Sequence, residues 1–139
     1  MAENLSGRLV DLKAAGIMSS PVAAIRADAS IREAARAMAE HKVSGLPVLD
    51  AKGKGVGLIS ASDLVACLVA PQDGDRKVRD VMTPGIVTAP FDATLGQVAR
   101  LMAEKRIHRV FIRSQGRIRG VVTSLDVTRA VWRASRRED

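Results

Sequence analysis

The sequence repeats itself once, and this duplication constrains the fold more than any other feature. A shift of 64 positions, reduced to 63 after a one-residue gap, brings identical residues of the two halves together. The matched pairs include Met18 with Met82, Asp28 with Asp92, Gly57 with Gly120 and Asp63 with Asp126. Colinear matches of this kind indicate a true duplication, so both halves are predicted to adopt the same order of elements.

Each copy is predicted to have the order β-α-β-β-α. Ser30 with Glu33 and Thr94 with Gln97 match the capping box that starts a helix. Apolar residues then recur at helical spacing, at Ile31, Ala34, Ala35 and Met38 and at their counterparts in the second copy. The predicted strands are residues 22–25, 47–50 and 56–60, then 86–89, 110–113 and 118–123, and the closing helices are residues 62–70 and 124–134.

The duplication also predicts the domain organisation. The first repeat spans residues 8–70, a linker follows at 71–76, the second repeat spans 77–134, and residues 135–139 form a charged tail. One copy of about 50 residues cannot cover both faces of its own sheet. The predicted fold is therefore α/β (α+β), with both repeats packed into one module over residues 1–139.

The amino-acid composition indicates a folded, positively charged protein. Hydrophobic residues make up 47% of the chain and are nearly all aliphatic, which indicates a folded core. The net charge of +7 is uneven, because residues 71–139 carry 14 basic and 8 acidic side chains. This positive field favours anions. Neither a signal peptide nor a membrane span is apparent, and the single cysteine, Cys67, indicates a reducing compartment, so a cytoplasmic location is expected.

The strongest local signal is a motif that occurs twice. A glycine, two apolar residues, a hydroxyl residue, two variable residues and an aspartate stand at each predicted junction between a strand and a helix. The motif residues are Gly57, Ser60 and Asp63, and Gly120, Thr123 and Asp126. Helix capping explains the hydroxyl and the acid but not the glycine, which indicates close approach by another group. Alternatively, the helix amides and the hydroxyl hold a phosphate while the aspartate binds a ribose. The motif alone leaves both interpretations open.

With these motifs, the chain resembles a tandem pair of cystathionine-β-synthase (CBS) domains, also called a Bateman module, from about Ile17 to Trp132. Further residues carry the resemblance: the openings around Met18 and residues 78–84, and the central segments 41–50 and 106–112. The resemblance implies that two β-α-β-β-α repeats pack by their sheets around a pseudo-twofold axis. It also implies two clefts that bind an adenosine nucleotide, each with residues from both repeats.

The resemblance implies the following site residues. In one cleft, Asp126, Thr123 and Ser124 would bind ribose and phosphate, with His108 and Arg109 near the phosphates, and Ser30, Ala35, Val43 and Ser44 would line the base pocket. In the other, Asp63 and Ser60 would face Thr94, Ile107 and His108. Lys42 and Arg106 would add positive charge.

Two positions differ between the copies. Phe111 stands where the first copy has Pro47, and Arg109 stands where it has Gly45. The two clefts are therefore not electrostatically equal. We expect the Asp126 cleft to bind phosphate more tightly.

The remaining candidates are interpreted as structural. His41 and Cys67 lie outside any metal-ligand spacing, so no metal site is predicted. Residues 53–57 are rich in glycine but precede a strand, which favours a hairpin over a dinucleotide loop. Met18, Met38, Met82 and Met102 are assigned to the core. The chain shows no hydrolase signature. We expect no enzyme, no required cofactor, and a nucleotide that is sensed and not turned over.

The expected ligand is AMP, ADP, ATP or S-adenosylmethionine, in a role such as energy sensing. The resemblance also implies a homodimer, and the regulated protein is expected on another chain. The alternative is a ligand-free interaction protein whose basic surface, including Arg129, Arg133, Arg136 and Arg137, binds a protein or nucleic acid. Three aromatic residues leave little for base stacking, which disfavours nucleic acid. Trp132 would seal the core or lie at an oligomer contact.

Overall fold

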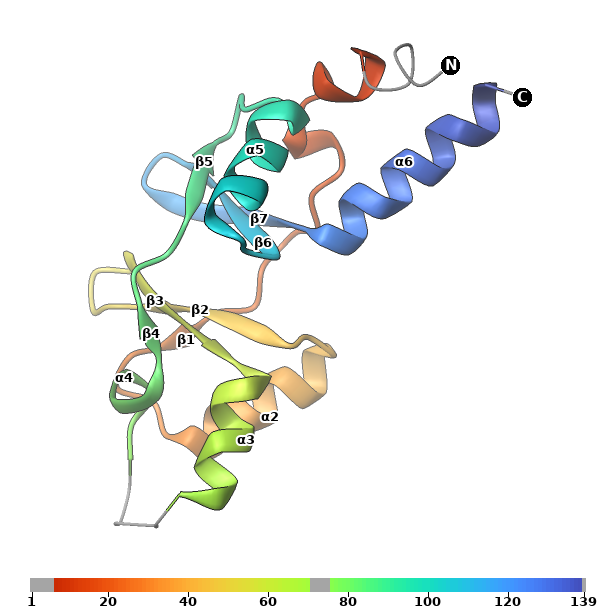
Figure 1. Cartoon of the computed structure of the whole chain (residues 1–139). Coiled ribbons are helices and arrows are strands. Elements are labelled where there is room, and N and C mark those ends of the chain that lie inside the picture. Colours follow the sequence, from red (N-terminus) through yellow and green to blue (C-terminus); the bar gives the residue numbers. More distant parts are fainter. Residues whose placement is uncertain (1–6, 71–75, 139) are drawn as a thin grey trace. The chain divides into compact units, whose positions relative to one another are not determined.

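The chain folds into mixed α and β structure with two small sheets (Figure 1). A computed structural model describes residues 7–70 and 76–138. The described residues form two compact units. One unit spans Ala23–Ile86, and the other combines the residues up to Val22 with residues 87–138. Each unit is described separately below.

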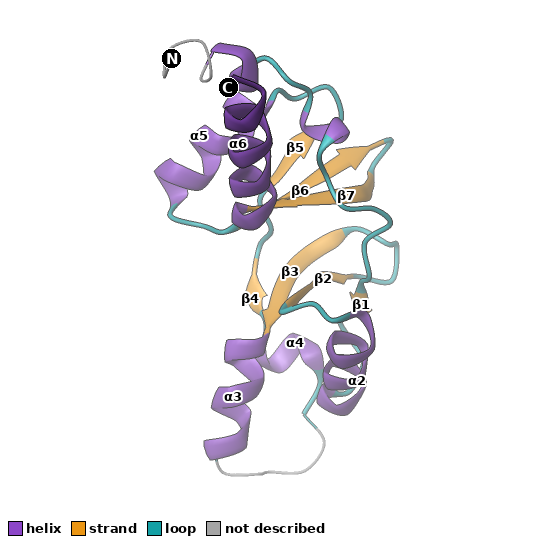
Figure 2. Ribbon diagram, turned by 90° about the vertical axis from the view of Figure 1, so that its right-hand side faces the viewer, coloured by secondary structure: helices purple, strands orange, loops and turns teal. Residues whose placement is uncertain are grey.

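The Ala23–Ile86 unit is built on a four-stranded sheet with the order β1-β2-β3-β4. Its strands are β1 (Ile25–Arg26), β2 (Gly45–Leu49), β3 (Gly55–Ser60) and β4 (Thr83–Pro84), and its helices are α2 (Ile31–His41), α3 (Ala61–Val69) and α4 (Val78–Val81). β1 and β2 are parallel, and the other neighbours are antiparallel. Helices α2 and α3 lie on the same side of this sheet (Figure 2).

The other unit is built on a three-stranded sheet with the order β5-β6-β7. Its elements are the 3₁₀ turn η1 (Ala14–Gly16), β5 (Thr88–Pro90), α5 (Leu95–Lys105), β6 (Arg109–Ser114), β7 (Arg117–Thr123) and α6 (Ser124–Glu138). β5 and β6 are parallel, whereas β6 and β7 form an antiparallel hairpin. The pairing therefore repeats that of β1, β2 and β3.

Each unit has its own aliphatic core between its sheet and its helices. Leu46, Val48 and Ile59 are fully buried in the first core, and Val110, Ile112 and Val122 are fully buried in the second. Met38 is buried, and Met18, Met82 and Met102 pack against the two cores. Their predicted core role is confirmed. Ala35 is exposed, so its predicted place in the buried stripe of α2 is wrong, because it lies on the flank of the stripe that Ala34 and Met38 define.

The compact units differ from the sequence repeats in where the opening segments pack. β4 belongs to the second sequence repeat but pairs with β3 of the first. Correspondingly, Ser19 of the first repeat forms an antiparallel bridge with Val121 in β7. Each sheet therefore receives its outermost pairing from the other repeat's opening segment. This exchange follows from long-range pairing, which the local pattern of the sequence does not encode.

Most predicted elements are confirmed, with shifted ends. β1 begins at Ile25, later than predicted, because its pairing with β2 starts where Ile25 stands opposite Val48. α6 continues to Glu138, through the predicted tail, because no proline or glycine interrupts it. Residues 53–57 belong to the β2–β3 hairpin, as predicted. Residues 71–75 of the predicted linker 71–76 lie outside the described residues.

The helix ends also repeat. Ser30 Oγ accepts a hydrogen bond from the Glu33 amide, and Thr94 forms a complete capping box with Gln97. The return half of the box is not seen at Ser30 among the described residues. Lys42 and Arg106 end α2 and α5 in the left-handed region, with φ of 56° and 54°.

Within the described ranges, the structure has no helix that is both long and apolar enough to span a bilayer.

Candidate functional site

The first copy of the motif lies where β3 passes into α3. Ser60 is the N-cap of α3, and its hydroxyl accepts a hydrogen bond from the Asp63 amide at 3.3 Å. In return, Asp63 Oδ2 accepts hydrogen bonds from the Ser60 amide at 2.8 Å and from the Ser60 hydroxyl at 3.0 Å. Both hydrogen bonds that the Asp63 side chain accepts use the same carboxylate oxygen.

The second copy repeats this geometry where β7 passes into α6. Asp126 Oδ2 accepts from the Thr123 amide at 2.8 Å and from the Thr123 hydroxyl at 3.0 Å. The other oxygen, Oδ1, lies 4.0 Å from the Arg129 guanidinium, and the Asp126 side chain is only 11% exposed. Capping thus explains the hydroxyl and the acid in both copies. It occupies one oxygen of each carboxylate, and in the second copy the other faces a cation.

The first amides of the two closing helices are largely occupied. The Ala61 amide donates to the Ser44 carbonyl at 2.8 Å, and the Ser124 amide donates to the His108 carbonyl at 2.9 Å. Asp63 and Asp126 donate their amides to the capping hydroxyls. Among the first three residues of each closing helix, the amides of Ser62 and Leu125 are the ones that take no part in these cap and backbone hydrogen bonds. A phosphate at either helix start would therefore find a single amide, and its charge would have to be met by side chains.

The glycine of each motif is explained by a methionine. A Cβ atom on Gly57 would lie 2.6 Å from Met82 Sδ and 2.7 Å from the Thr83 carbonyl oxygen. A Cβ atom on Gly120 would overlap Met18 Sδ and lie 2.7 Å from Met18 Cγ. Real Cβ atoms do not approach other atoms this closely, so a larger residue at Gly120 would require Met18 to move, and one at Gly57 would require the Thr83 backbone to move as well. The close approach expected from the sequence is made by the chain itself.

The surroundings of the two motifs differ in charge. In the strand register, Gly45 stands opposite Ser60, whereas Arg109 stands opposite Thr123. Arg109 is half-buried, and this burial lowers the pKa of its guanidinium from the ordinary value. Arginine remains charged in proteins despite such a change. The second motif therefore has a cation opposite its cap, at the position where the first motif has a glycine.

His108 and Ser124 add a second difference. The Ser124 hydroxyl lies 3.5 Å from His108 Nδ1 and 3.4 Å from the His108 carbonyl oxygen. In the first copy the corresponding residues are Ser44 and Ala61, and the Ala61 amide donates to the Ser44 carbonyl. An exposed imidazole therefore accompanies only the Thr123 motif.

The structure groups the predicted site residues by unit. The Ala23–Ile86 unit holds Ser30, Ala35, Lys42, Val43, Ser44, Ser60 and Asp63, and the other unit holds Thr94, Arg106, Ile107, His108, Arg109, Thr123, Ser124 and Asp126. Within the units, the motif residues come together with Ser44 in one and with His108 and Arg109 in the other. Lys42 and Arg106 are exposed helix C-caps. Each predicted cleft combines residues of both units and stays a prediction.

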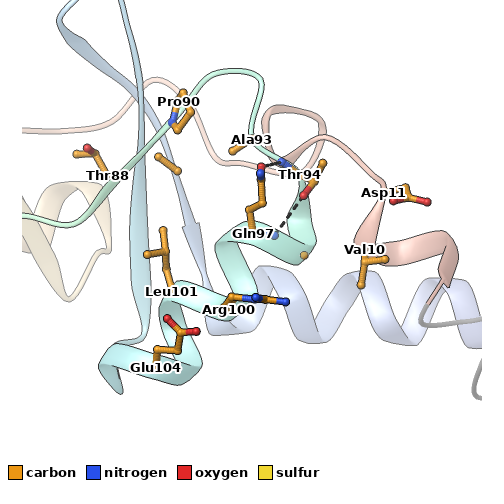
Figure 3. Close-up of a pocket in the computed structure, with 12 residues that line it drawn as sticks. Val10, Asp11, Thr88, Pro90, Ala93, Thr94, Gln97, Arg100, Leu101 and Glu104 are labelled. Carbon is orange, nitrogen blue, oxygen red and sulfur yellow. Dashed lines mark hydrogen bonds between the residues drawn. The ribbon is translucent and has the colours of Figure 1, made fainter.

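A groove of about 780 Å³ opens along α5 (Figure 3). Its walls come from α5, β5 and residues 10–11, and they include Thr94, Gln97, Arg100 and Glu104. Of the predicted site residues it contains only Thr94, whose hydroxyl accepts a hydrogen bond from the Gln97 amide at 3.2 Å. This groove is therefore distinct from the two motifs.

Two β-α-β-β-α repeats, each with a capped aspartate where its last strand meets its last helix, define a tandem-repeat class of α+β module. The CBS domain family model matches residues 14–70 and 78–133. The chain belongs to the CBS domain family.

Solved structures of the same fold include complexes with adenosine compounds. One is the CBS domain pair of protein MJ0100 in complex with 5′-methylthioadenosine and S-adenosyl-L-methionine, with 31% identity, a TM-score of 0.76 and coverage of 86% of this chain and 94% of that one. Another is CBSX2 in complex with AMP, with 27% identity, a TM-score of 0.75 and coverage of 89% and 98%.

Among curated proteins, an inosine-5′-monophosphate dehydrogenase from Aquifex aeolicus is 29% identical over 116 residues, covering 82% of this chain and 23% of that protein. An uncharacterized protein from Methanocaldococcus jannaschii, MJ1426, is 28% identical over 92% of this chain and 95% of its own length. The chain spans less than a quarter of the first curated relatives it matches, with shares of 22% to 23%. The likeness to those enzymes is thus a likeness to one of their regions.

Proposed function

We propose that this protein is a regulatory module that binds an adenosine nucleotide or S-adenosylmethionine without turning it over. The observation that carries the proposal is the doubled cap, in which Ser60 with Asp63 and Thr123 with Asp126 have the same hydrogen bonds. Solved relatives with the same fold bind AMP, or S-adenosylmethionine and 5′-methylthioadenosine. These ligands share an adenosine.

The cap uses only one carboxylate oxygen of each aspartate, and we propose that the other oxygen binds the ligand. Both internal hydrogen bonds of the Asp126 carboxylate go to Oδ2. In the proposal, Oδ1 accepts hydrogen bonds from the ribose hydroxyls, which are strong because the acceptor is charged. Capping and ribose binding then use different oxygens of one side chain. The cap orients the carboxylate before the ligand arrives, which reduces the entropy lost on binding.

The second motif is proposed as the tighter phosphate site. Arg109 stands opposite Thr123 in the sheet, and His108 lies beside Ser124. Ser30, Ala35, Val43 and Ser44 are proposed to line the base pocket of this cleft. In the other cleft, Asp63 and Ser60 are proposed to face Thr94, Ile107 and His108, and Lys42 and Arg106 to add charge.

Calorimetric titration with AMP, ADP, ATP and S-adenosylmethionine tests the proposal. We expect at least one ligand to bind with submillimolar affinity. Asp126→Ala should weaken that binding by about ten- to a hundredfold, because a hydrogen bond to a charged group contributes about 1.5–3 kcal/mol.

Asp80→Ala is the matched control. Asp80 Oδ2 accepts a hydrogen bond from the Lys77 amide at 2.8 Å, so Asp80 caps α4 as Asp126 caps α6, but it lies outside both motifs. Asp80→Ala should leave the affinity unchanged. The proposal fails if no ligand binds below millimolar concentration, or if Asp126→Ala behaves like wild type.

We further propose that the module acts as a homodimer and regulates a protein on another chain. Helix α3 exposes Val65, Leu68 and Val69, with exposed fractions of 65%, 82% and 82%. Such apolar side chains in one helix mark an interaction surface. Sedimentation equilibrium of wild type and Leu68→Glu tests this, and a monomeric wild type would contradict it.

One observation favours the alternative, an interaction protein. The outer face of α6 carries Leu125, Arg129, Trp132 and Arg136, and Trp132 is 61% exposed. One of the two predicted roles of Trp132, sealing the core, is therefore wrong, because its side chain is exposed. The Arg136 guanidinium lies 5.9 Å from the centre of the Trp132 ring. Tryptophan and arginine together are typical of the centre of protein interfaces.

Trp132 is the single tryptophan of the chain, so its fluorescence reports this face alone. The alternative predicts a blue shift with an acidic amphipathic peptide, lost at high salt and retained in the Asp63→Ala, Asp126→Ala double variant. No shift with the peptide, or a shift independent of salt, would exclude it. A duplex DNA serves as the nucleic-acid comparison.

A further inference from the structure

The two opening segments that carry the methionines, residues 17–22 and 81–86, are called the straps here. Each strap pairs with the strand that leads to a motif. In the first strap, Ser19 exchanges two backbone hydrogen bonds with Val121, at 2.9 and 3.0 Å. In the second, Thr83 and Pro84 pair with Leu58 and Gly57, and the Gly85 amide donates to the Val56 carbonyl at 2.9 Å. A strap thus forms the outer neighbour of each motif strand.

The methionine anchors each strap next to the cap. Gly57 precedes Ser60 in the same strand, as Gly120 precedes Thr123. Met82 and Met18 fill the space that a side chain on these glycines would take. Both methionines also pack against the aliphatic core of their unit. The position of the motif strand is therefore set from one side by the hairpin partner and from the other by the methionine.

The straps cross between the repeats of the sequence. Met18 belongs to the first repeat but contacts Gly120 of the second, and Met82 belongs to the second but contacts Gly57 of the first. The chain then continues from each strap directly into the other compact unit, at Ala23 and at Val87. A displacement of a motif strand would therefore also displace its strap, which is the segment that leads into the other unit.

We propose that Met18 and Met82 are positioning residues, each for the motif of the other sequence repeat. Met18 holds the Thr123–Asp126 cap in its binding geometry, and Met82 holds the Ser60–Asp63 cap. This inference rests on the proposed nucleotide binding. A nucleotide that binds the ordered cap also stabilises the strap, because binding to one state of a coupled element favours that state.

Met18→Ala and Met82→Ala test the inference, with Met102→Ala and Met38→Ala as matched controls. The controls remove the same side chain from the same two cores, but from α5 and α2, which carry neither a strap nor a motif. The titrant is the tightest-binding nucleotide of the calorimetric panel. Asp63→Ala isolates the Asp126 motif, and Asp126→Ala isolates the Asp63 motif.

We expect Met18→Ala to weaken binding by about two- to thirtyfold when only the Asp126 motif remains, and to leave it unchanged when only the Asp63 motif remains. Met82→Ala should show the opposite pattern. Equal effects of strap and helix methionines would overturn the inference while leaving nucleotide binding intact. Loss of binding in wild type would instead contradict the proposed function.

Hydrogen exchange of the nucleotide-free protein provides a second readout that does not depend on binding. Met18→Ala should speed amide exchange in β7 and the first turn of α6, but not in β3 and α3, and Met82→Ala should do the reverse. Exchange that rises equally in both motifs, or no more than in the helix controls, would overturn the positioning role.

The glycines allow a rescue experiment. The three atoms nearest to a Cβ on Gly120 all belong to the Met18 side chain, so Met18→Ala combined with Gly120→Ala should restore slow exchange in β7. Gly57→Ala also meets the Thr83 carbonyl oxygen, at 2.7 Å, so Met82→Ala should not restore β3. Failure of rescue at Gly120, or full rescue at Gly57, would contradict the assigned contacts.

Discussion

The Ser60–Asp63 and Thr123–Asp126 motifs have the same hydrogen bonds and different neighbours. In both, the aspartate accepts from the amide and the hydroxyl of the cap, at 2.8 and 3.0 Å. Opposite the cap, however, the first motif has Gly45 and the second has Arg109. The comparison shows that the backbone geometry of the motif has been kept through the duplication, while the charge around it has changed. We infer that the motifs share a ligand chemistry and differ in affinity for its phosphates.

The closing helices α3 and α6 likewise share one feature and differ in another: their first turns are alike, but their exposed faces are not. α3 and α6 begin with equivalent caps, but α3 has one charged residue, whereas α6 is longer and rich in arginine. The exposed face of α3 is aliphatic, and that of α6 combines Trp132 with cations. The helix starts are alike because they serve the motif. The outer faces have diverged because nothing in the motif constrains them.

The largest effect is expected from exchanging the residues opposite the caps. Arg109→Gln should weaken ATP binding by about tenfold or more, because it removes the charge-assisted hydrogen bond to phosphate that we propose for Arg109. Gly45→Arg should strengthen ATP binding at the Asp63 motif. Calorimetry at low and physiological salt measures both. Adenosine, which lacks phosphate, is the control ligand and should respond to neither change. If these substitutions changed the binding of adenosine and ATP equally, the two motifs would not differ in their affinity for phosphate.

An intermediate effect is expected from removing the capping hydroxyls. Ser60→Ala and Thr123→Ala should each lower the free energy of unfolding by about 1 kcal/mol, because each leaves a helix amide without its acceptor. Urea denaturation measures the loss. Ser135→Ala is the control, because its hydroxyl donates to the Trp132 carbonyl and caps no helix start. Clearly unequal losses at Ser60 and Thr123 would show that the two caps are not equivalent.

The smallest effect is expected at the hairpin turns. Asp50 Oδ1 accepts hydrogen bonds from the Lys54 and Lys52 amides, each at 2.9 Å, and these lower the pKa of the Asp50 carboxyl. The second hairpin instead turns through Gln115 and Gly116, with φ of 54° and 73°. Because the pKa is lowered on folding, the stabilisation by Asp50 is present above its ordinary pKa and is lost as the pH falls through the folded value.

Asp50→Asn should therefore lower the melting temperature slightly at neutral pH, and the difference from wild type should shrink at strongly acidic pH. Thermal unfolding followed by circular dichroism across this range measures it. A difference that grows on acidification would contradict the assigned turn, and an equal response to Gln115→Ala would remove the contrast between the hairpins.

Much of the fold was predictable from local patterns. Helix starts were found because capping residues stand at fixed short spacing, as at Thr94 and Gln97. The hairpins were found because glycine-containing links join apolar runs. The opening strands were placed too early, because their start depends on pairing with distant strands. The site residues were named from a family resemblance, and the structure establishes the geometry around the caps within each unit.

The duplication, the element order and the doubled cap are properties of the sequence itself. The duplication appears as matches between the two halves, and the elements and caps arise from residues a few positions apart. Three features required the tertiary structure. Met18 and Met82 contact Gly120 and Gly57 across the sequence repeats, Arg109 stands opposite Thr123, and each strap joins the other repeat's sheet. All three depend on register and packing between distant segments. Local propensity carries no information about such contacts, since it is the burial of the whole sheet that selects them.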